Sequence, residues 1–216
     1  MRFEALIFDC DGVIVDSEKY SCGAWNVLMK EEYNIDIGTN YDAILGKNGI
    51  YTAKYYLEMN NLEHNPRLLE ELSRKKEEVY YRIAGSNLKP VSGVQKVIED
   101  AKKLRMKIAV ASSGTLEKIN FSLNEINLRD EFETIICADD VKKSKPAPDI
   151  FITAMKKLNV LPEKSIVIED SISGITAAKL SGAFTIGITT SHLKETLKEA
   201  DLIIDKFQDL ELRSLE

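Results

Sequence analysis

Short, continuous apolar runs recur along the chain, separated by longer stretches in which apolar positions follow a helical period. Runs without a polar residue at every second position are typical of strands in a parallel sheet that is covered on both faces. The predicted strands are residues 4–8, 107–111, 134–137, 165–168 and 184–187, with a short edge strand at 202–204.

Helical periodicity fills the intervals between these runs. Ser92 is predicted to cap a helix whose apolar positions recur at intervals of three and four residues from 94 to 104. Pro148 is predicted to begin another helix, because its fixed φ suits the first helical turn. This alternation of strands and helices predicts an α/β fold with a doubly wound parallel sheet, a Rossmann-like core.

Residues 17–88 break the alternation. Their pattern is helical throughout, with helices predicted at about 20–30, 51–59 and 66–83. The pair Asn65-Pro66 is typical of a helix start. We therefore expect a helical cap domain of residues 17–88, inserted between two core segments. These core segments are residues 1–16 and 89–216.

Charge and cysteine content narrow the class of protein. The chain of 216 residues has a formal net charge of −6, so nothing indicates the basic face that nucleic acid or anionic lipid requires. Its three cysteines include no CxxC pair, and free thiols fit a reducing compartment. The N-terminus lacks a signal-peptide pattern, and no run of about 18 apolar residues could span a membrane. We expect a cytoplasmic monomer with no nucleic-acid or membrane partner.

Polar side chains follow four of the predicted strands. In open α/β sheets, ligands bind at the carboxyl ends of the strands, so these side chains are candidates for one site. They are Asp9 and Asp11 after the first strand, Ser112, Ser113 and Gly114 after the second, Lys145 in the loop after the third, and Glu169 and Asp170 at the end of the fourth.

The acids among these residues indicate a metal ion. The four carboxylates carry a formal charge of −4, which Lys145 reduces by one. Buried acids repel one another unless a cation gathers them, and Mg²⁺ prefers a few carboxylates together with water and a substrate phosphate. Each signal alone is common, because a single DxD at a strand end is usually a turn or a cap. Four such signals in order predict a magnesium and phosphate site.

The ordered motifs resemble those of the haloacid dehalogenase-like hydrolases. The motifs are DxDG, a hydroxyl residue after the second strand, KPxPxxF and EDSxxG, and the resemblance spans nearly the whole chain. The helical insertion is similar to the branch that contains sugar-phosphate phosphatases and β-phosphoglucomutase. The resemblance implies a Mg²⁺-dependent phosphatase that hydrolyses a small phosphorylated metabolite, such as a sugar phosphate, through an aspartyl-phosphate intermediate.

The same resemblance implies catalytic roles for four residues. Asp9 would be the nucleophile, and Asp11 would protonate the leaving oxygen and later take a proton from water. Ser112 would donate a hydrogen bond to the phosphoryl oxygens. Lys145 would neutralise charge on the phosphoryl group and on the nucleophile.

Binding roles follow from the resemblance in the same way. Asp9, the backbone carbonyl of Asp11 and Asp170 would hold the metal, and Glu169 would support it through water. Backbone amides in the Ser113-Gly114 turn would complete a phosphate cradle.

Departures from related families leave alternatives open. Asp11 argues against dehalogenases, which lack an acid at that position. The mutase branch carries a cap histidine and a cap arginine, whose nearest counterparts here are Ser21 and Gly49, so a phosphomutase is the second hypothesis. A non-catalytic phosphate-binding regulatory module is the third. In the cap, Lys47 is a candidate contact for a substrate anion.

Overall fold

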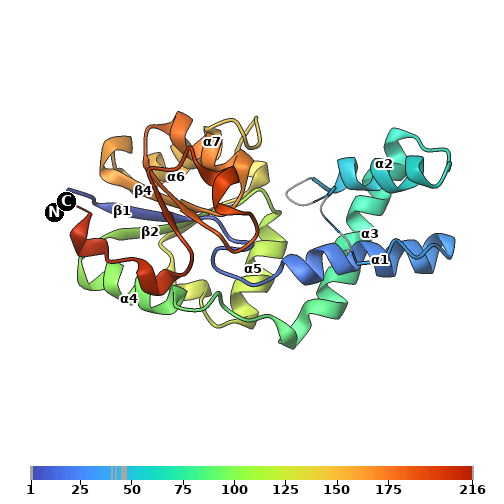
Figure 1. The fold of residues 1–216 in the computed structure, drawn as a ribbon, viewed down its shortest axis with the longest axis horizontal. Coiled ribbons are helices and arrows are strands. Elements are labelled where there is room, and N and C mark those ends of the chain that lie inside the picture. Colours follow the sequence, from blue (N-terminus) through green and yellow to red (C-terminus); the bar gives the residue numbers. More distant parts are fainter. Residues whose placement is uncertain (1, 40, 42, 45–47, 216) are drawn as a thin grey trace. The chain divides into compact units, whose positions relative to one another are not determined.

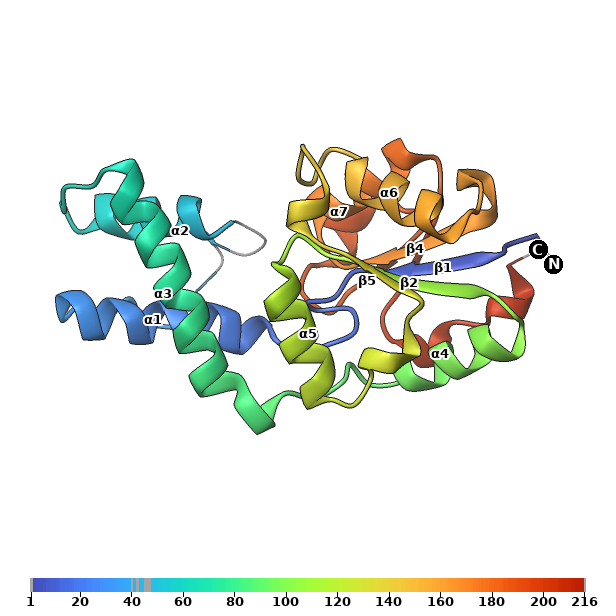
Figure 2. The same cartoon turned by 180° about the vertical axis from the view of Figure 1, so that it is seen from behind.

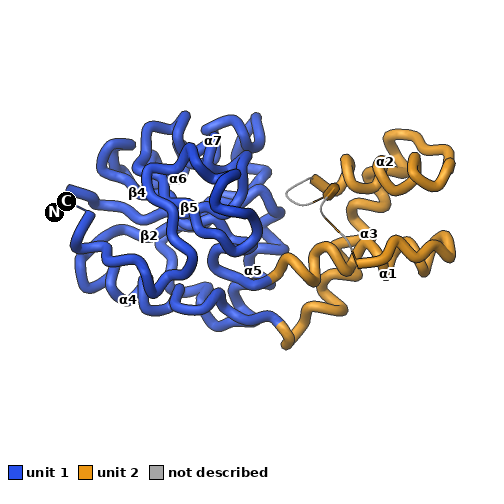
Figure 3. The backbone as a smooth tube through the Cα atoms, in the orientation of Figure 1, with its two compact units in different colours: residues 1–16, 88–216 blue, residues 17–87 orange. Residues whose placement is uncertain are grey.

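Two compact units make up the structure, a computed structural model that describes residues 2–39, 41, 43–44 and 48–215. Unit 1 consists of Met1–Asp16 and Leu88–Glu216, and unit 2 consists of Ser17–Asn87 (Figure 3). Unit 2 is therefore an insertion that follows the first strand of unit 1 and its turn. No helix in the described part of the chain combines the length and the apolar character that crossing a membrane requires.

A six-stranded parallel sheet lies at the centre of unit 1 (Figure 1). The strand order is β3-β2-β1-β4-β5-β6, which reverses direction beside β1 as doubly wound sheets do. The predicted α/β fold class is confirmed. The strands are β1 (Ala5–Phe8), β2 (Lys107–Ala111), β3 (Thr134–Ile136), β4 (Ser165–Glu169), β5 (Phe184–Ile188) and β6 (Leu202–Ile204).

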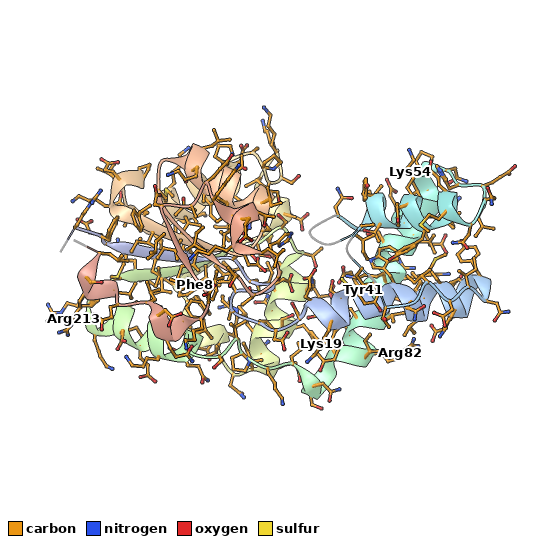
Figure 4. The ribbon with its side chains drawn as sticks, in the orientation of Figure 1. Phe8, Lys19, Tyr41, Lys54, Arg82 and Arg213 are labelled. Carbon is orange, nitrogen blue, oxygen red and sulfur yellow. The ribbon has the colours of Figure 1, made fainter. Side chains whose placement is uncertain are left out.

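Helices cover both faces of this sheet. Helices α6 (Asp149–Leu158) and α7 (Ile172–Ser181) lie on one face, and α4 (Val94–Lys103) lies on the other (Figure 2). Helix α5 (Leu116–Glu125) connects β2 to the segment before β3. Burial on both faces explains why the strands are apolar runs without alternation. Phe8 lies in this interior, whereas Arg213 points outward (Figure 4).

The cap of helix α4 differs from the sequence prediction. Its N-cap is Gly93 with φ of 91°, and no side chain caps it, so the predicted Ser92 cap is wrong. The Ser92 hydroxyl instead accepts a hydrogen bond from Gln208 Nε2 at 3.1 Å. A side chain at position 93 would be strained in this left-handed backbone and would meet Phe207 Cβ at 3.0 Å, which favours glycine there.

In the described residues, unit 2 contains three α-helices, the last of which is followed by a short 3-10 helix at Gly85–Asn87. They are α1 (Glu18–Tyr33), α2 (Gly49–Met59) and α3 (Pro66–Ala84). Asn65 caps α3, because its side chain accepts a hydrogen bond from the Leu68 amide at 3.0 Å. Trp25 of α1 is buried and its ring packs against Tyr56 of α2 at a centroid distance of 6.4 Å. Lys47, the predicted cap contact, lies outside the described residues.

Candidate active site

The turn after β1 carries the first two acids. Strands β1 and β4 are neighbours, with Phe8 beside Ile168, and the Asp9 amide donates to the Ile168 carbonyl at 3.0 Å. The turn closes with Gly12 at φ of 75°, a conformation that favours glycine. A Cβ at Gly12 would also lie 2.0 Å from Asp170 Oδ2. The side chain of Asp170 therefore packs directly on the DxDG turn.

Lys145 joins the ends of three strands. Its Nζ donates to Asp9 Oδ1 at 2.5 Å, to Glu169 Oε1 at 2.6 Å and to the Ala111 carbonyl at 3.3 Å. The ammonium group also lies 4.8 Å from the centroid of the Phe151 ring. These partners lie directly after β1, in β4, in β2 and in α6, so the lysine connects the nucleophile candidate to two neighbouring strands and a helix.

Burial controls the electrostatics of this cluster. Burial raises the pKa of the Asp9 carboxyl, Lys145 opposes that rise, and the carboxylates of Glu169 and Asp11 add to it. Burial alone would lower the pKa of Lys145, but the carboxylates of Asp9 and Glu169 outweigh burial and raise it. Lys145 is thus held as a cation, and Asp9 would be stabilised as an anion by additional positive charge.

Glu169 anchors the turn between β4 and α7. Its Oε2 accepts hydrogen bonds from the amides of Asp170 and Ser171 and from the Ser171 hydroxyl, at 2.8–2.9 Å. Its Oε1 accepts from Lys145. A Cβ at Gly174 would lie 1.8 Å from Oε1, so the glycine of the EDSxxG motif leaves the space that this carboxylate occupies.

Two hydroxyl residues after β5 complete the surroundings of Asp170. Ser191 Oγ donates to Asp170 Oδ2, and Thr190 Oγ1 donates to the Gly12 carbonyl at 2.6 Å. Thr190 Oγ1 also lies 3.5 Å from Asp170 Oδ2. The sequence analysis did not single out these residues. The only available signal was their place at the carboxyl end of a parallel strand.

A second lysine, also not anticipated from the sequence, contacts Asp11. Lys118 Nζ of α5 donates to Asp11 Oδ2 at 2.8 Å, and only 8% of Lys118 is exposed. A lysine so deeply buried is unusual unless it is paired. The pair connects the second acid of the DxDG turn to the first turns of α5.

The Ser112-Gly114 turn follows β2. Ser112 is buried, its amide donates to the Ile136 carbonyl at 3.0 Å, and its Oγ accepts from the Gly114 amide at 3.3 Å. The turn begins directly after Ala111, whose carbonyl accepts from Lys145. Ser113 is exposed. The predicted core residues therefore occupy the carboxyl ends of β1, β2 and β4 and the loop before α6.

The donor set fits a hard divalent cation. Asp9, Asp11, Glu169 and Asp170 carry four formal negative charges, and Lys145 and Lys118 return two positive ones, so a divalent ion would neutralise the group. In the described residues, no three His, Cys, Asp or Glu side chains are gathered closely enough to form a protein-only cage. Mg²⁺ commonly uses one or two carboxylates and completes its shell with water and phosphate, so this arrangement suits it.

Comparison with known proteins identifies the family. The sequence model described as haloacid dehalogenase-like hydrolase matches residues 6–188, which include the DxDG turn, Lys145 and the Glu169-Asp170 pair. The chain belongs to the haloacid dehalogenase-like hydrolases. The family and the enzyme class predicted from the sequence, a phosphoric monoester hydrolase, are both confirmed.

Similar proteins include one named as a phosphatase and others named as β-phosphoglucomutases. A "Phosphorylated carbohydrates phosphatase" of Thermotoga maritima is 31% identical over 182 residues, which cover 83% of this chain and 82% of that protein. A "Beta-phosphoglucomutase" of Bacillus subtilis is 29% identical over 219 residues, covering 98% and 93%. The crystal structure of a β-phosphoglucomutase from Clostridium difficile has a TM-score of 0.85 at 30% identity, and the similarity covers 99% of this chain and 95% of that one.

Proposed function

We propose that this hydrolase removes phosphate from a small phosphorylated metabolite of the sugar-phosphate class, with the Asp9 carboxylate as nucleophile. The observation that carries the proposal is the buried ion pair between Asp9 and Lys145, at the edge of the sheet where ligands bind. The relative named for phosphorylated carbohydrates supports the substrate class.

In the first half of the reaction, a carboxylate oxygen of Asp9 attacks phosphorus. The bond between phosphorus and the leaving oxygen breaks, and Asp11 gives its proton to that oxygen, so an alcohol departs and an aspartyl-phosphate forms. Lys145 offsets negative charge on Asp9 and the phosphoryl oxygens during this transfer. Ser112 would donate a hydrogen bond to the same oxygens.

In the second half, Asp11 acts as a base. Its carboxylate takes a proton from water while the water oxygen attacks phosphorus, and the bond between phosphorus and Asp9 breaks. Inorganic phosphate leaves, Asp9 is again a carboxylate, and Asp11 again carries a proton. One residue can serve both halves because its acid and base forms are used in turn.

Mg²⁺ would be held by the carboxylates of Asp9 and Asp170 and by the backbone carbonyl of Asp11. When bound, it supplies positive charge that lets a phosphate dianion approach this acidic group. Glu169 would act behind these ligands, since its oxygens accept hydrogen bonds from Lys145 and from the turn that carries Asp170.

Release of inorganic phosphate from a panel of phosphorylated sugars and related metabolites tests the proposal. We expect turnover of at least one sugar phosphate, its loss by at least about 10³-fold in Asp9→Asn, and its loss on chelation with recovery on adding Mg²⁺. Asp209→Asn, which changes a surface acid that pairs with Lys206 at 3.9 Å, is the matched control. Activity that survives either Asp9→Asn or EDTA would contradict the nucleophile or the metal role respectively.

A phosphomutase is the second candidate, because two of the similar proteins are named β-phosphoglucomutase. Against it, the nearest counterpart of the mutase histidine is Ser21, whose Oγ accepts a hydrogen bond from Lys76 at 2.9 Å. Incubation of a sugar monophosphate with its bisphosphate, followed by ³¹P NMR, separates the two. Transfer between positions of one sugar, faster than phosphate release, would establish the mutase.

We further propose that unit 2 acts as a substrate-selecting cap domain.

A further inference from the structure

Among the described residues of the site, Lys118 is a buried cation that the mechanism above does not use. Its side chain is 10% exposed and that of its partner Asp11 is 23% exposed, with 2.8 Å between Nζ and Oδ2. Burial of this kind restricts both side chains and excludes most of the water that would compete for the carboxylate. The contact therefore constrains the direction in which the Asp11 carboxylate points.

The backbone of Lys118 is fixed as well. Thr115 caps helix α5, and its Oγ1 accepts a hydrogen bond from the Lys118 amide at 3.3 Å. The aliphatic part of Lys118 runs along the turn after β2, because a Cβ at Gly114 would lie 3.7 Å from Lys118 Cδ and 3.6 Å from Ser112 Oγ. The lysine thus connects two segments that belong to the site, the turn after β2 and the DxDG turn.

We propose that Lys118 is a positioning residue that orients the Asp11 carboxylate for both proton transfers. The inference rests on the proposed function, because it assigns Asp11 the acid and base roles. Lys118 itself exchanges no proton and forms no bond. Proton transfer requires the donor and acceptor to be within hydrogen-bond reach, and a displacement of about 1 Å can cost about 10²-fold in rate.

A double-mutant cycle with p-nitrophenyl phosphate tests this role. We expect Lys118→Met to lower kcat by about 10–10²-fold with little change in KM, and Lys118→Arg to recover part of the loss. Asp11→Asn should cost about 10²–10⁴-fold. Adding Lys118→Met to Asp11→Asn should cost less than about threefold more, because the lysine acts through the residue that has already been removed.

A leaving group that needs no proton provides an independent measurement. With 2,4-dinitrophenyl phosphate, Lys118→Met should keep a rapid burst of dinitrophenolate but show slower steady-state turnover, because only the second half then depends on Asp11. Lys179→Met, which breaks a more exposed ion pair with Asp201 outside the site, is the control and should leave both phases unchanged. If the methionine variant does not fold, Lys118→Gln can be measured in the same assays, with the same expected results.

The outcomes separate this inference from the proposed function. No hydrolysis by the wild type, or full activity of Asp9→Asn, overturns the function itself. With an active wild type, losses that multiply in the double variant, or a Lys118→Met variant that matches the Lys179→Met control, overturn the positioning role. A rise in KM at unchanged kcat also overturns it, since Lys118 would then bind the substrate anion directly.

Discussion

At the scale of single residues, the site pairs each acid of the DxDG turn with its own lysine. Asp9 contacts Lys145 and Asp11 contacts Lys118, at 2.5 and 2.8 Å. Asp170 receives hydrogen bonds from hydroxyl groups instead. The two lysines therefore act where a nucleophile and a proton-transfer group are proposed, and the neutral donors act where a metal ligand is proposed.

Ser191→Ala should weaken Mg²⁺ binding. The variant removes the hydroxyl that donates to Asp170 Oδ2, and loss of a group that orients a metal ligand typically costs about 10–100-fold in affinity. Calorimetric titration of the substrate-free protein with Mg²⁺ measures the change directly. Ser214→Ala serves as the control, because its exposed hydroxyl donates to the nearby Glu211 carbonyl. Equal Mg²⁺ affinity in the two variants would contradict the orienting role of Ser191.

The three cysteines should resist thiol reagents in the folded protein. All three are buried, burial raises the pKa of the Cys10 thiol well above its usual value, and burial also raises that of Cys137. A raised pKa keeps the thiols of Cys10 and Cys137 protonated at about pH 8, where an ordinary free thiol is partly the reactive thiolate. Burial shields Cys22 from the reagent. A colorimetric thiol assay should titrate three groups in denaturant and react slowly before unfolding. Rapid modification of the native protein would be the opposite result.

At the scale of elements, the connection from β4 to α7 combines a carboxylate, a helix cap and a glycine. Ser171 caps α7, accepting from the Gly174 amide at 3.0 Å, while the Glu169 carboxylate lies against the first turn of the same helix. The helix start therefore fixes Glu169, and Glu169 in turn fixes the ammonium of Lys145. A change in backbone geometry at this helix start would therefore affect Asp9 through the contact of Glu169 with Lys145 and that of Lys145 with Asp9.

Replacing Gly174 with alanine should disturb this connection strongly, although the change adds only one methyl group. In Gly174→Ala the new Cβ would lie 1.8 Å from Glu169 Oε1, so we expect a loss of about 1–3 kcal/mol in the free energy of unfolding and a large loss of activity. Gly23→Ala in α1 is the matched control, because its Cβ would be 3.9 Å from Ile83. That variant should be neutral or stabilised by up to about 1 kcal/mol. Urea unfolding and phosphate release measure both effects.

At the scale of the whole molecule, metal and phosphate analogues should stabilise unit 1. Beryllium fluoride with Mg²⁺ mimics a phosphoryl group on a carboxylate, and a ligand at about 100 times its Kd adds about 2.7 kcal/mol to the free energy of unfolding. We expect a higher Tm in the wild type, with slower hydrogen exchange at the carboxyl ends of β1 and β4. Asp9→Asn should show neither change. A similar shift in that variant would mean that the complex forms elsewhere.

Much of this fold could be predicted because each strand is an uninterrupted apolar segment. The predicted strand at 107–111 has the observed bounds, and the run at 134–137 ends one residue beyond β3. The predicted helical pattern from residue 94 matches the start of α4 at Val94, but its N-cap could not be predicted. The geometry of the cap depends on Phe207 and Gln208, more than a hundred residues away, which crowd Gly93. Packing that distant in sequence has no local signature.

The residues of the candidate site also divide into those that the sequence predicted and those that it could not predict. Asp9, Lys145 and Glu169 could be proposed together because parallel strands bring their carboxyl ends to one edge, and the structure joins them by ion pairs. Lys118 could not, because it lies 107 residues from Asp11 in sequence and nothing local distinguishes it from a surface lysine of an ordinary helix. Ser191, 21 residues from Asp170, depends likewise on how the loop after β5 folds back.

The enclosure of Lys145 has a consequence for the response of the enzyme to ionic strength. The side chains of Lys145, Asp9 and Glu169 are 6, 10 and 1% exposed, so dissolved ions cannot come between them. Pairs on the surface, such as Lys96 with Asp100, are screened over a Debye length of about 10 Å at 0.1 M salt. Salt should therefore slow the capture of an anionic substrate from bulk solution, while the contacts that hold the nucleophile keep their strength.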